Sequence, residues 1–165
     1  HPFRDGNGRT GRILNILLLV HKNLLEIPIL YLSSYIIENK DDYYTLLNNV
    51  TTRNKWDEWL LYMFCCVEKT SLFTISRINE IDALFSRTYE VVGKKLPHIS
   101  KEVIEKIFEQ PYVSPRALLS PDVRSLNTAK KYLSQLSGLG IMTPKKLGKE
   151  IIYINLDLFN LLSET

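Results

Sequence analysis

The chain has 165 residues, of which 45% are hydrophobic and 24% are charged, and its formal net charge is +3. This length allows one or two ordinary domains, and the mixed composition excludes a disordered or polyelectrolyte chain. The three histidines lie far apart in the sequence and have no CxxC partner, so a zinc site is not expected. Cys65 and Cys66 are adjacent in an apolar stretch, where two buried free thiols suit a reducing cytoplasm.

The N-terminal part of the chain has the apolar spacing of helices. Over residues 9–25 apolar side chains occupy every helix face, which predicts a central buried helix. Pro28 ends this helix, and shorter helices are predicted over residues 30–37 and 39–50. Polar residues interrupt the apolar region 13–37, so it lacks the roughly 20 uninterrupted apolar residues that a membrane span needs. We therefore expect a cytoplasmic protein without membrane contact.

Two longer helices are predicted next. The first begins at Trp56 and continues to Val67, and the second covers residues 72–96. Trp56 and Trp59 share a face of the first helix, which indicates core positions. The segment 93–97 combines glycine, two lysines and proline and is a good boundary, so the predicted domains are residues 1–98 and 99–165.

The C-terminal domain has a different pattern. Short helices are predicted over residues 103–108, 114–119 and 125–136. Residues 141–143 and 151–154 predict the strands of a hairpin around a turn rich in lysine and glycine. Three short helices and a hairpin are typical of a winged helix-turn-helix. The expected fold class is therefore mainly α, with a helical bundle followed by a small winged helix-turn-helix domain.

Basic residues of the C-terminal domain are candidates for phosphate contacts. Those near the third short helix and in the hairpin form the possible nucleic-acid surface, namely Arg124, Lys130, Lys131, Lys145 and Lys146. Acidic residues nearly balance these charges, which favours a regulatory or protein-contact module over DNA binding. DNA therefore stays the alternative partner of this domain.

The strongest signal is the opening HPFRDGNGRTGR, which predicts a loop that runs into a helix. Three glycines let backbone N–H groups approach an anion, and the helix adds its positive N-terminal end. Arg9 and Arg12 share a helix face and can hold successive phosphates. Asp5 is a hard oxygen ligand suited to Mg²⁺, and His1 is a natural proton acceptor for a hydroxyl. Together these groups suit transfer from a nucleotide.

Two generic motifs compete for the same residues. The glycines match G-x-G-x-x-G, but that fingerprint needs flanking strands, and a long apolar helix follows here. The segment also has P-loop spacing, with Arg12 in place of the lysine and Ile13 in place of the Mg²⁺-binding Ser or Thr. Neither motif accounts for His1 or Asp5.

The opening segment resembles the Fic family signature, H-P-F-x-[DE]-G-N-G-R-x-x-R, without a mismatch. Residues 36–44 and the C-terminal domain are similar to bacterial two-domain Fic proteins, so the resemblance covers essentially the whole chain. It implies a Fic-type helical bundle and an enzyme that transfers AMP from ATP, with Mg²⁺, to a Ser, Thr or Tyr hydroxyl of a protein.

The resemblance also implies roles for the matching residues. His1 is expected to be the base that deprotonates the target hydroxyl, and Asp5 is expected to hold Mg²⁺. Arg9 and Arg12 are expected to bind the outer phosphates. The other expected nucleotide-binding residues are Gly6, Asn7 and Gly8 at the α- and β-phosphates, Thr10 and Gly11 through their backbone, and Tyr43 and Tyr44 at the adenosine.

Two alternatives to AMP transfer stay open. Related phosphotransferases carry lysine at the position of Gly8, so this glycine favours AMP transfer. The second alternative is a regulator led by the winged helix, which binds DNA or protein. Residues 34–39 match the family's short inhibitory pattern [ST]-x-x-x-E-[GN], and we interpret the match as chance because a structural helix is expected there.

The chain opens on His1 rather than on an initiator Met, so we expect a C-terminal fragment whose helical bundle is incomplete at its N-terminus. The helix over residues 9–25 is apolar all round, and we do not expect this chain alone to cover it. The isolated chain is therefore expected to associate with another polypeptide, such as a second copy in a homodimer, and to transfer no AMP.

Overall fold

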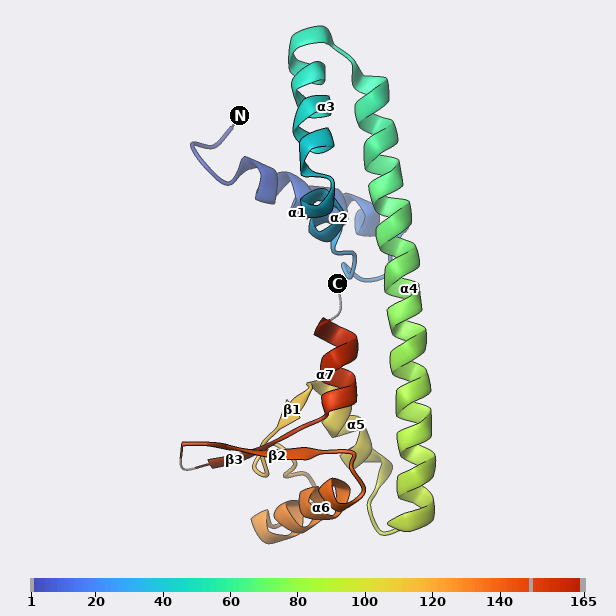
Figure 1. The fold of residues 1–165 in the computed structure, drawn as a ribbon, viewed down its shortest axis with the longest axis vertical. Helices are drawn as coiled ribbons and strands as arrows, with labels where there is room; N and C mark the ends of the chain where they lie inside the picture. The colour runs from blue at the N-terminus through green and yellow to red at the C-terminus, as the bar shows by residue number, and fades with distance from the viewer. Residues whose placement is uncertain (1, 149, 164–165) are drawn as a thin grey trace. The chain divides into compact units, whose positions relative to one another are not determined.

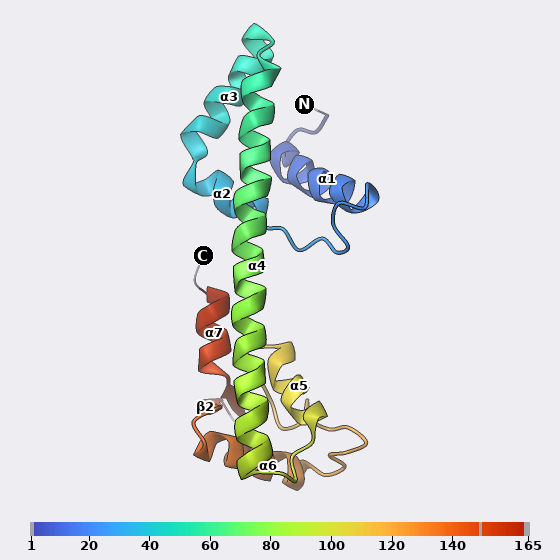
Figure 2. The same cartoon turned by 90° about the vertical axis from the view of Figure 1, so that its right-hand side faces the viewer.

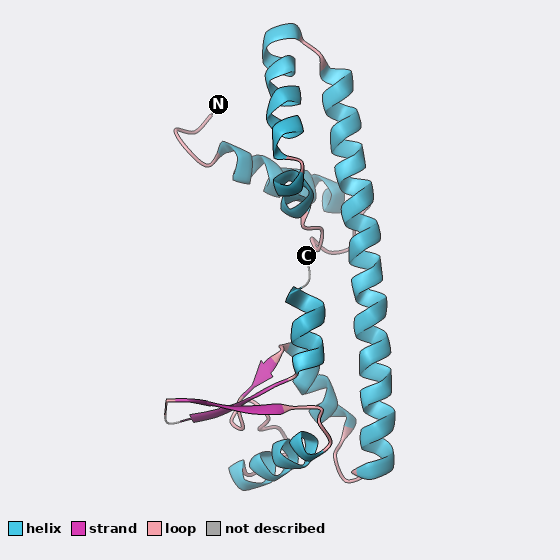
Figure 3. Ribbon diagram, in the orientation of Figure 1, coloured by secondary structure: helices cyan, strands magenta, loops and turns pink. Residues whose placement is uncertain are grey.

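The computed structural model describes residues 2–148 and 150–163, and within them the fold is mainly helical, as predicted (Figure 3). The chain divides into two compact units, His1–Ser76 and Arg77–Thr165. Helix α4 (Trp56–Lys95) runs through the point of division, and the boundary at residues 98 and 99 stays a prediction. Among the described residues, no helix is both long enough and apolar enough to cross a membrane.

The N-terminal unit contains helices α1 (Asn7–His21), α2 (Leu32–Glu38), α3 (Lys40–Arg53) and the first part of α4. Figure 1 shows α3 beside the first turns of α4, where the rings of Tyr43 and Trp59 lie with their centroids 5.1 Å apart. The buried cluster of this unit is small and consists of Leu30, Leu32, Ile36, Tyr62 and Cys66.

Helix α1 ends before residue 25, where the sequence pattern had predicted its end, because Asn23 adopts a left-handed conformation with φ 56°. The N–H of Asn23 donates to Val20 O at 3.0 Å, and that of Leu24 donates to Leu19 O at 2.9 Å. This pair of bonds is a Schellman turn, which satisfies the last carbonyl groups of the helix.

The prediction of a buried central helix is wrong for α1, which has no buried residue. Ile13, Leu14 and Leu17 are 60%, 58% and 51% exposed. Ile16 and Leu19 are partly buried and pack against the cluster of the N-terminal unit. The described chain thus covers one face of α1 and leaves the others open, as we expected for this chain alone.

Helix α4 is one continuous helix of 40 residues, so the prediction of separate helices over 56–67 and 72–96 is wrong. The residues between them include neither glycine nor proline, and Thr70 Oγ1 satisfies its donor within the helix by bonding Cys66 O at 2.7 Å. Trp56 is also a correction, because it is 51% exposed instead of lying in the core.

The C-terminal unit contains the rest of α4, α5 (Lys101–Glu109), β1 (Tyr112–Val113), α6 (Leu126–Gly138), β2 (Thr143–Leu147), β3 (Glu150–Ile154) and α7 (Leu156–Ser163). The sheet is antiparallel with the order β1-β3-β2. Figure 2 shows α5 beside the last turns of α4, where Phe85 and Phe108 have ring centroids 5.2 Å apart. The predicted outer helices are confirmed, and so is the hairpin, although its first strand covers residues 143–147 instead of 141–143. Lys145 and Lys146 therefore lie in β2 and not in the turn, and β1 and α7 were not predicted.

The helix predicted over residues 114–119 is a turn. Its hydrogen bonds join residues three apart, from Ala117 N–H to Ser114 O at 3.0 Å and from Leu119 N–H to Arg116 O at 3.2 Å. Pro115 has no N–H to donate, and so short a segment cannot offset the cost of helix nucleation.

The core of the C-terminal unit joins its helices to its sheet. Helices α5 and α6 both place apolar residues in it at helical spacing, and its members include Val103, Ile104, Ile107, Ala129, Leu133, Leu136, Met142 and Tyr153. Helix α6 starts at a defined cap, because Ser125 Oγ accepts the N–H of Thr128 at 3.0 Å.

Candidate active site

The predicted phosphate cradle is a left-handed glycine followed by the start of α1. Gly6 has φ +79°, a conformation that a side chain would strain. The first bond of the helix runs from Thr10 N–H to Gly6 O at 2.9 Å. Within this described helix, the N–H groups of Asn7, Gly8 and Arg9 therefore precede the first intrahelical bond and have no acceptor in it. Such free N–H groups, with the helix dipole, form a binding site for an anion.

Asn7 holds the preceding loop in place with both ends of its side-chain amide. Its Oδ1 accepts the N–H of Phe3 at 3.0 Å, and its Nδ2 donates to Phe3 O at 2.7 Å. The loop is otherwise exposed to solvent, so this pair of bonds fixes residues 3–7 as a closed turn. The side chain of Asn7 is thus a positioning group for the loop that carries Asp5.

The two motif arginines fold back over the glycines instead of pointing away from the cradle. A Cβ atom added to Gly8 would lie 3.4 Å from Nη1 of Arg12, and one added to Gly6 would lie 3.8 Å from Nη2 of Arg9. Both guanidinium groups therefore stand beside the free N–H groups at the start of α1. Five donors on each guanidinium can then reach an anion that the backbone already holds.

Asp5 offers a carboxylate at the edge of the cradle. One oxygen accepts the N–H of Gly6 at 2.6 Å, and the other lies 3.7 Å from Nη2 of Arg9. The side chain is 96% exposed, which leaves its remaining acceptor positions open. No group of three His, Cys, Asp or Glu residues gathers anywhere in residues 2–148 and 150–163. This donor set fits Mg²⁺, which commonly binds through one carboxylate together with phosphate and water.

A pocket of about 380 Å³ lies beside the cradle, entirely within the N-terminal unit. Its walls come from the loop, α1, α2, α3 and α4, and they include Asn7, Gly8, Thr10, Gly11, Arg12, Ile36, Tyr43, Leu47, Trp59 and Met63. The wall near the cradle is polar and cationic, whereas the far wall is aromatic and aliphatic. A pocket with this distribution suits a ligand with an anionic end and a flat apolar end.

Tyr43 and Tyr44 lie in different environments although they are adjacent. Tyr43 is half-buried, lines the pocket and touches Trp59, while Tyr44 is 58% exposed and does not line it. Behind Tyr43, burial raises the pKa of Tyr62 to about 12, with smaller contributions from Cys66 and Tyr35. Tyr62 therefore stays neutral and supports the aromatic wall, with its ring centroid 6.1 Å from that of Tyr43.

His1, the expected general base, lies outside the described residues. The loop that follows it begins with Pro2 and Phe3, both of which line the pocket. Trp59 is one of several pocket residues that sequence reasoning missed, since its spacing with Trp56 had indicated the core. The two tryptophans differ in their contacts, which the sequence pattern does not reveal. Trp59 packs against Tyr43 of α3, whereas the ring N–H of Trp56 donates to Asn54 Oδ1 at 2.9 Å.

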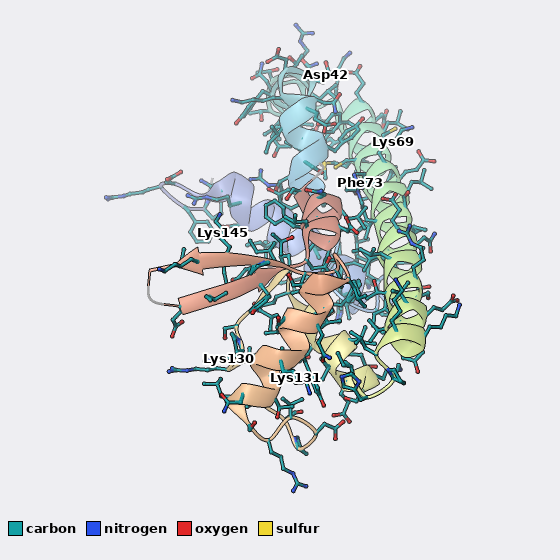
Figure 4. All side chains as sticks on the ribbon, turned by 60° about the horizontal axis from the view of Figure 1, so that its bottom comes forward. Asp42, Lys69, Phe73, Lys130, Lys131 and Lys145 are labelled. Atoms are coloured by element: carbon teal, nitrogen blue, oxygen red, sulfur yellow. The ribbon has the colours of Figure 1, made fainter. Side chains whose placement is uncertain are left out.

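The candidate nucleic-acid residues lie at the surface of the C-terminal unit. Lys130 and Lys131 extend from α6 and Lys145 from β2, as Figure 4 shows. Arg124 is tied to the loop before α6, because its Nε donates to Pro121 O at 3.1 Å. Lys130 lines a pocket of this unit, together with Arg116, which the sequence had not singled out.

Comparison with protein families matches both ends of this architecture. Residues 1–19, which hold the cradle and most of α1, match the model of the Fic/DOC family. Residues 84–158, which run from α4 to α7, match the model described as "Protein adenylyltransferase SoFic-like, C-terminal domain". The chain therefore belongs to the Fic family and carries a SoFic-like C-terminal domain.

Proposed function

We propose that this Fic protein is a protein adenylyltransferase, which transfers AMP from ATP to a Ser, Thr or Tyr hydroxyl of another protein. The observation that carries the proposal is the continuity of the phosphate cradle with the pocket beside it. Asn7, Gly8 and Arg12 of the cradle line this pocket together with Tyr43 and Trp59 of α3 and α4, and the Arg9 guanidinium stands near Gly6 of the same cradle. A nucleoside triphosphate has the matching distribution of charge and flat apolar surface.

The residues divide the reaction into binding and proton transfer. Arg9 and Arg12 hold the outer phosphates, and the backbone N–H groups of Gly8 and its neighbours hold the inner ones. Asp5 would hold Mg²⁺, which neutralises phosphate charge when it is bound. The target hydroxyl oxygen attacks the α-phosphorus, His1 accepts the hydroxyl proton, and the α–β phosphoanhydride bond breaks as pyrophosphate leaves.

Phosphotransfer is the competing reaction within the family, and Gly8 disfavours it. Related phosphotransferases carry lysine at this position, whereas a Cβ atom here would make only ordinary contact, 3.4 Å, with Nη1 of Arg12. The preference for AMP transfer therefore rests on the family resemblance, and Arg12 can hold the outer phosphates and leave the α-phosphorus to the incoming hydroxyl.

The test is incubation of the intact protein and a protein extract with ATP that is labelled either at the α- or at the γ-phosphate. We expect protein-bound label from α-labelled ATP, a mass gain that corresponds to AMP, and no such label with His1→Ala. Label that is retained only from γ-labelled ATP would show phosphotransfer instead. Absence of protein-bound label from both forms would reject an ATP-dependent transferase.

A further inference from the structure

A second pocket, of about 520 Å³, lies entirely within the C-terminal unit and has no part in the proposed transfer site. One wall is α6, another is the turn at residues 114–116, and the third is β3. Tyr153, which is 9% exposed and belongs to the core, lines the pocket together with Leu126 and Ile151. This is a preformed hollow with apolar side chains among its walls.

The cationic side chains of this pocket are available to a ligand. Arg116 and Lys130 both line it and are both exposed. Within the part of the chain that the structure describes, neither forms an ion pair. Lys146 stands directly opposite Ile151 in the β2–β3 ladder. Opposite residues of an antiparallel pair project from the same face of the sheet, so Lys146 adds positive charge on the pocket side.

Glu150, at the start of β3, is also among the residues that line the pocket, and its side chain is exposed. Its carboxylate would repel the phosphates of a duplex laid across this surface. The apolar walls would gain nothing from a phosphate backbone, whereas an inserted apolar side chain would be removed from water there. The volume suits one or two side chains of a peptide.

We propose that this pocket binds a short peptide segment of a partner protein, in which an apolar side chain is flanked by a carboxylate. The apolar side chain contacts Leu126, Ile151 and Tyr153. The carboxylate of the peptide pairs with Arg116 and Lys130. The pocket is a recognition site that stands apart from the transfer of AMP.

The experiment is selection of peptides from a random display library on the intact protein, followed by titration of the enriched peptide in fluorescence anisotropy. We expect the enriched sequences to share an apolar residue beside Asp or Glu. Charge-assisted bonds are the stronger class of hydrogen bond, so Lys130→Glu and Arg116→Glu should each raise the Kd by about tenfold or more. A peptide with Asn or Gln in place of its acid should bind the wild-type protein equally weakly.

Adjacent lysines supply the matched controls. Lys131 neighbours Lys130 on α6 but does not line the pocket, so Lys131→Glu should change the Kd by only about twofold, through screened long-range charge. Lys145 projects from the other face of the hairpin, so Lys145→Glu should weaken binding less than Lys146→Glu. All of these side chains are exposed, and thermal unfolding of each variant checks that the fold is unchanged.

Two results would overturn the proposal. One is a failure to enrich any acidic and apolar peptide, or an enriched peptide whose Kd does not respond to Lys130→Glu and Arg116→Glu. The other is binding to a DNA duplex of about 20 base pairs that depends on Lys130, Lys131 and Lys145 alike and falls steeply with salt, together with no peptide binding. Neither result bears on AMP transfer, which the labelled-ATP experiment tests separately.

Discussion

The two compact units of this chain differ in how far they bury their apolar helices. In the C-terminal unit, Ala129, Leu133 and Leu136 of α6 are all fully buried against α5 and the sheet. In the N-terminal unit, α1 has six leucine and isoleucine residues against three in α6, and none of the α1 residues is buried. The hydrophobic content of a helix is therefore a poor guide to its burial, which depends on what the rest of the chain can place beside it.

This difference in burial also distinguishes the site proposed for AMP transfer from the pocket proposed for peptide recognition. The N-terminal unit carries the predicted phosphate cradle on a helix that is only partly covered, so the geometry of the cradle depends on local interactions such as those of the Asn7 amide and on the left-handed Gly6. The C-terminal unit closes a core of its own and presents a pocket on a supported surface. We therefore expect changes in the first unit to alter catalysis and changes in the second to alter stability or recognition.

The largest expected effect is on AMP transfer. His1→Ala in the intact protein should lower the rate by about 10²–10⁴-fold, because a positioned base contributes that much to proton transfer, while ATP affinity stays near wild type. Mass spectrometry of the modified target measures the rate. Lys131→Ala, a change at the surface of the C-terminal unit, is the control and should leave transfer unaffected. A His1→Ala variant that transfers AMP at the wild-type rate would show that His1 is not the general base.

The second effect tests the contrast in burial directly. Leu133→Ala should lower the free energy of unfolding by about 2–5 kcal/mol, because it empties a fully buried position of α6. Leu17→Ala on α1, where the side chain is 51% exposed, should cost less than about 1 kcal/mol. Urea denaturation of each variant gives both values. Equal costs would mean that α1 is covered in solution by a surface that packs on Leu17.

The third effect concerns the arginines of the cradle. Arg9→Ala and Arg12→Ala should each weaken ATP binding by roughly 1.5–3 kcal/mol, because each removes a charge-assisted contact to phosphate. Calorimetry should show a much smaller loss for AMP, which lacks the outer phosphates. Arg4→Ala, at an exposed position of the same loop, is the control for loss of positive charge. Equal losses for ATP and AMP would contradict the assignment to outer phosphates.

The smallest effect follows from the buried thiol of the N-terminal unit. Burial raises the pKa of Cys66 from 9.0 to about 11. Between these values the unfolded thiol ionises and the folded thiol does not, so stability is lost as the pH rises through this window. The free energy of unfolding should fall by about 1 kcal/mol between pH 8 and pH 10 because of Cys66. This fall should diminish in Cys66→Ala and persist in Cys65→Ala, since Cys65 is exposed and not, as the sequence had led us to expect, buried.

The sequence predicted the elements whose signals are local. The glycine-rich opening predicted a loop running into a helix, and Ser125 with the apolar spacing after it predicted α6. The apolar run 151–154 predicted the second strand of the hairpin, whereas Lys145 and Lys146 were expected in the turn and lie in β2. The break assumed within α4 was wrong because a lapse in apolar spacing does not end a helix when no residue opposes helical geometry. The turn at Pro115 was missed for the converse reason, since a few favourable residues cannot nucleate a helix.

The candidate site was predictable in its residue types but not in its assembly. The motif predicted Gly6, Arg9 and Arg12 as phosphate ligands, which stays a prediction, and the structure adds that the two guanidinium groups lie near Gly6 and Gly8. Nothing local could distinguish Tyr43 from Tyr44, or Trp59 from Trp56, because α3 and α4 decide which side chain enters the pocket. Arg116 was missed because the turn that positions it against α6 was expected to be a helix.

The composition of strand β2 disfavours edge-to-edge association of this sheet between copies of the protein. β2 is an edge strand, since the sheet order is β1-β3-β2, and Pro144 within it has no N–H to offer a further strand. Lys145 and Lys146 follow, so the same edge is charged. The opposite edge, β1, is only two residues long. Growth of this sheet into an intermolecular, amyloid-like ladder is thereby disfavoured at both sides, and unwanted association would have to proceed through helix surfaces such as Leu14 and Leu17.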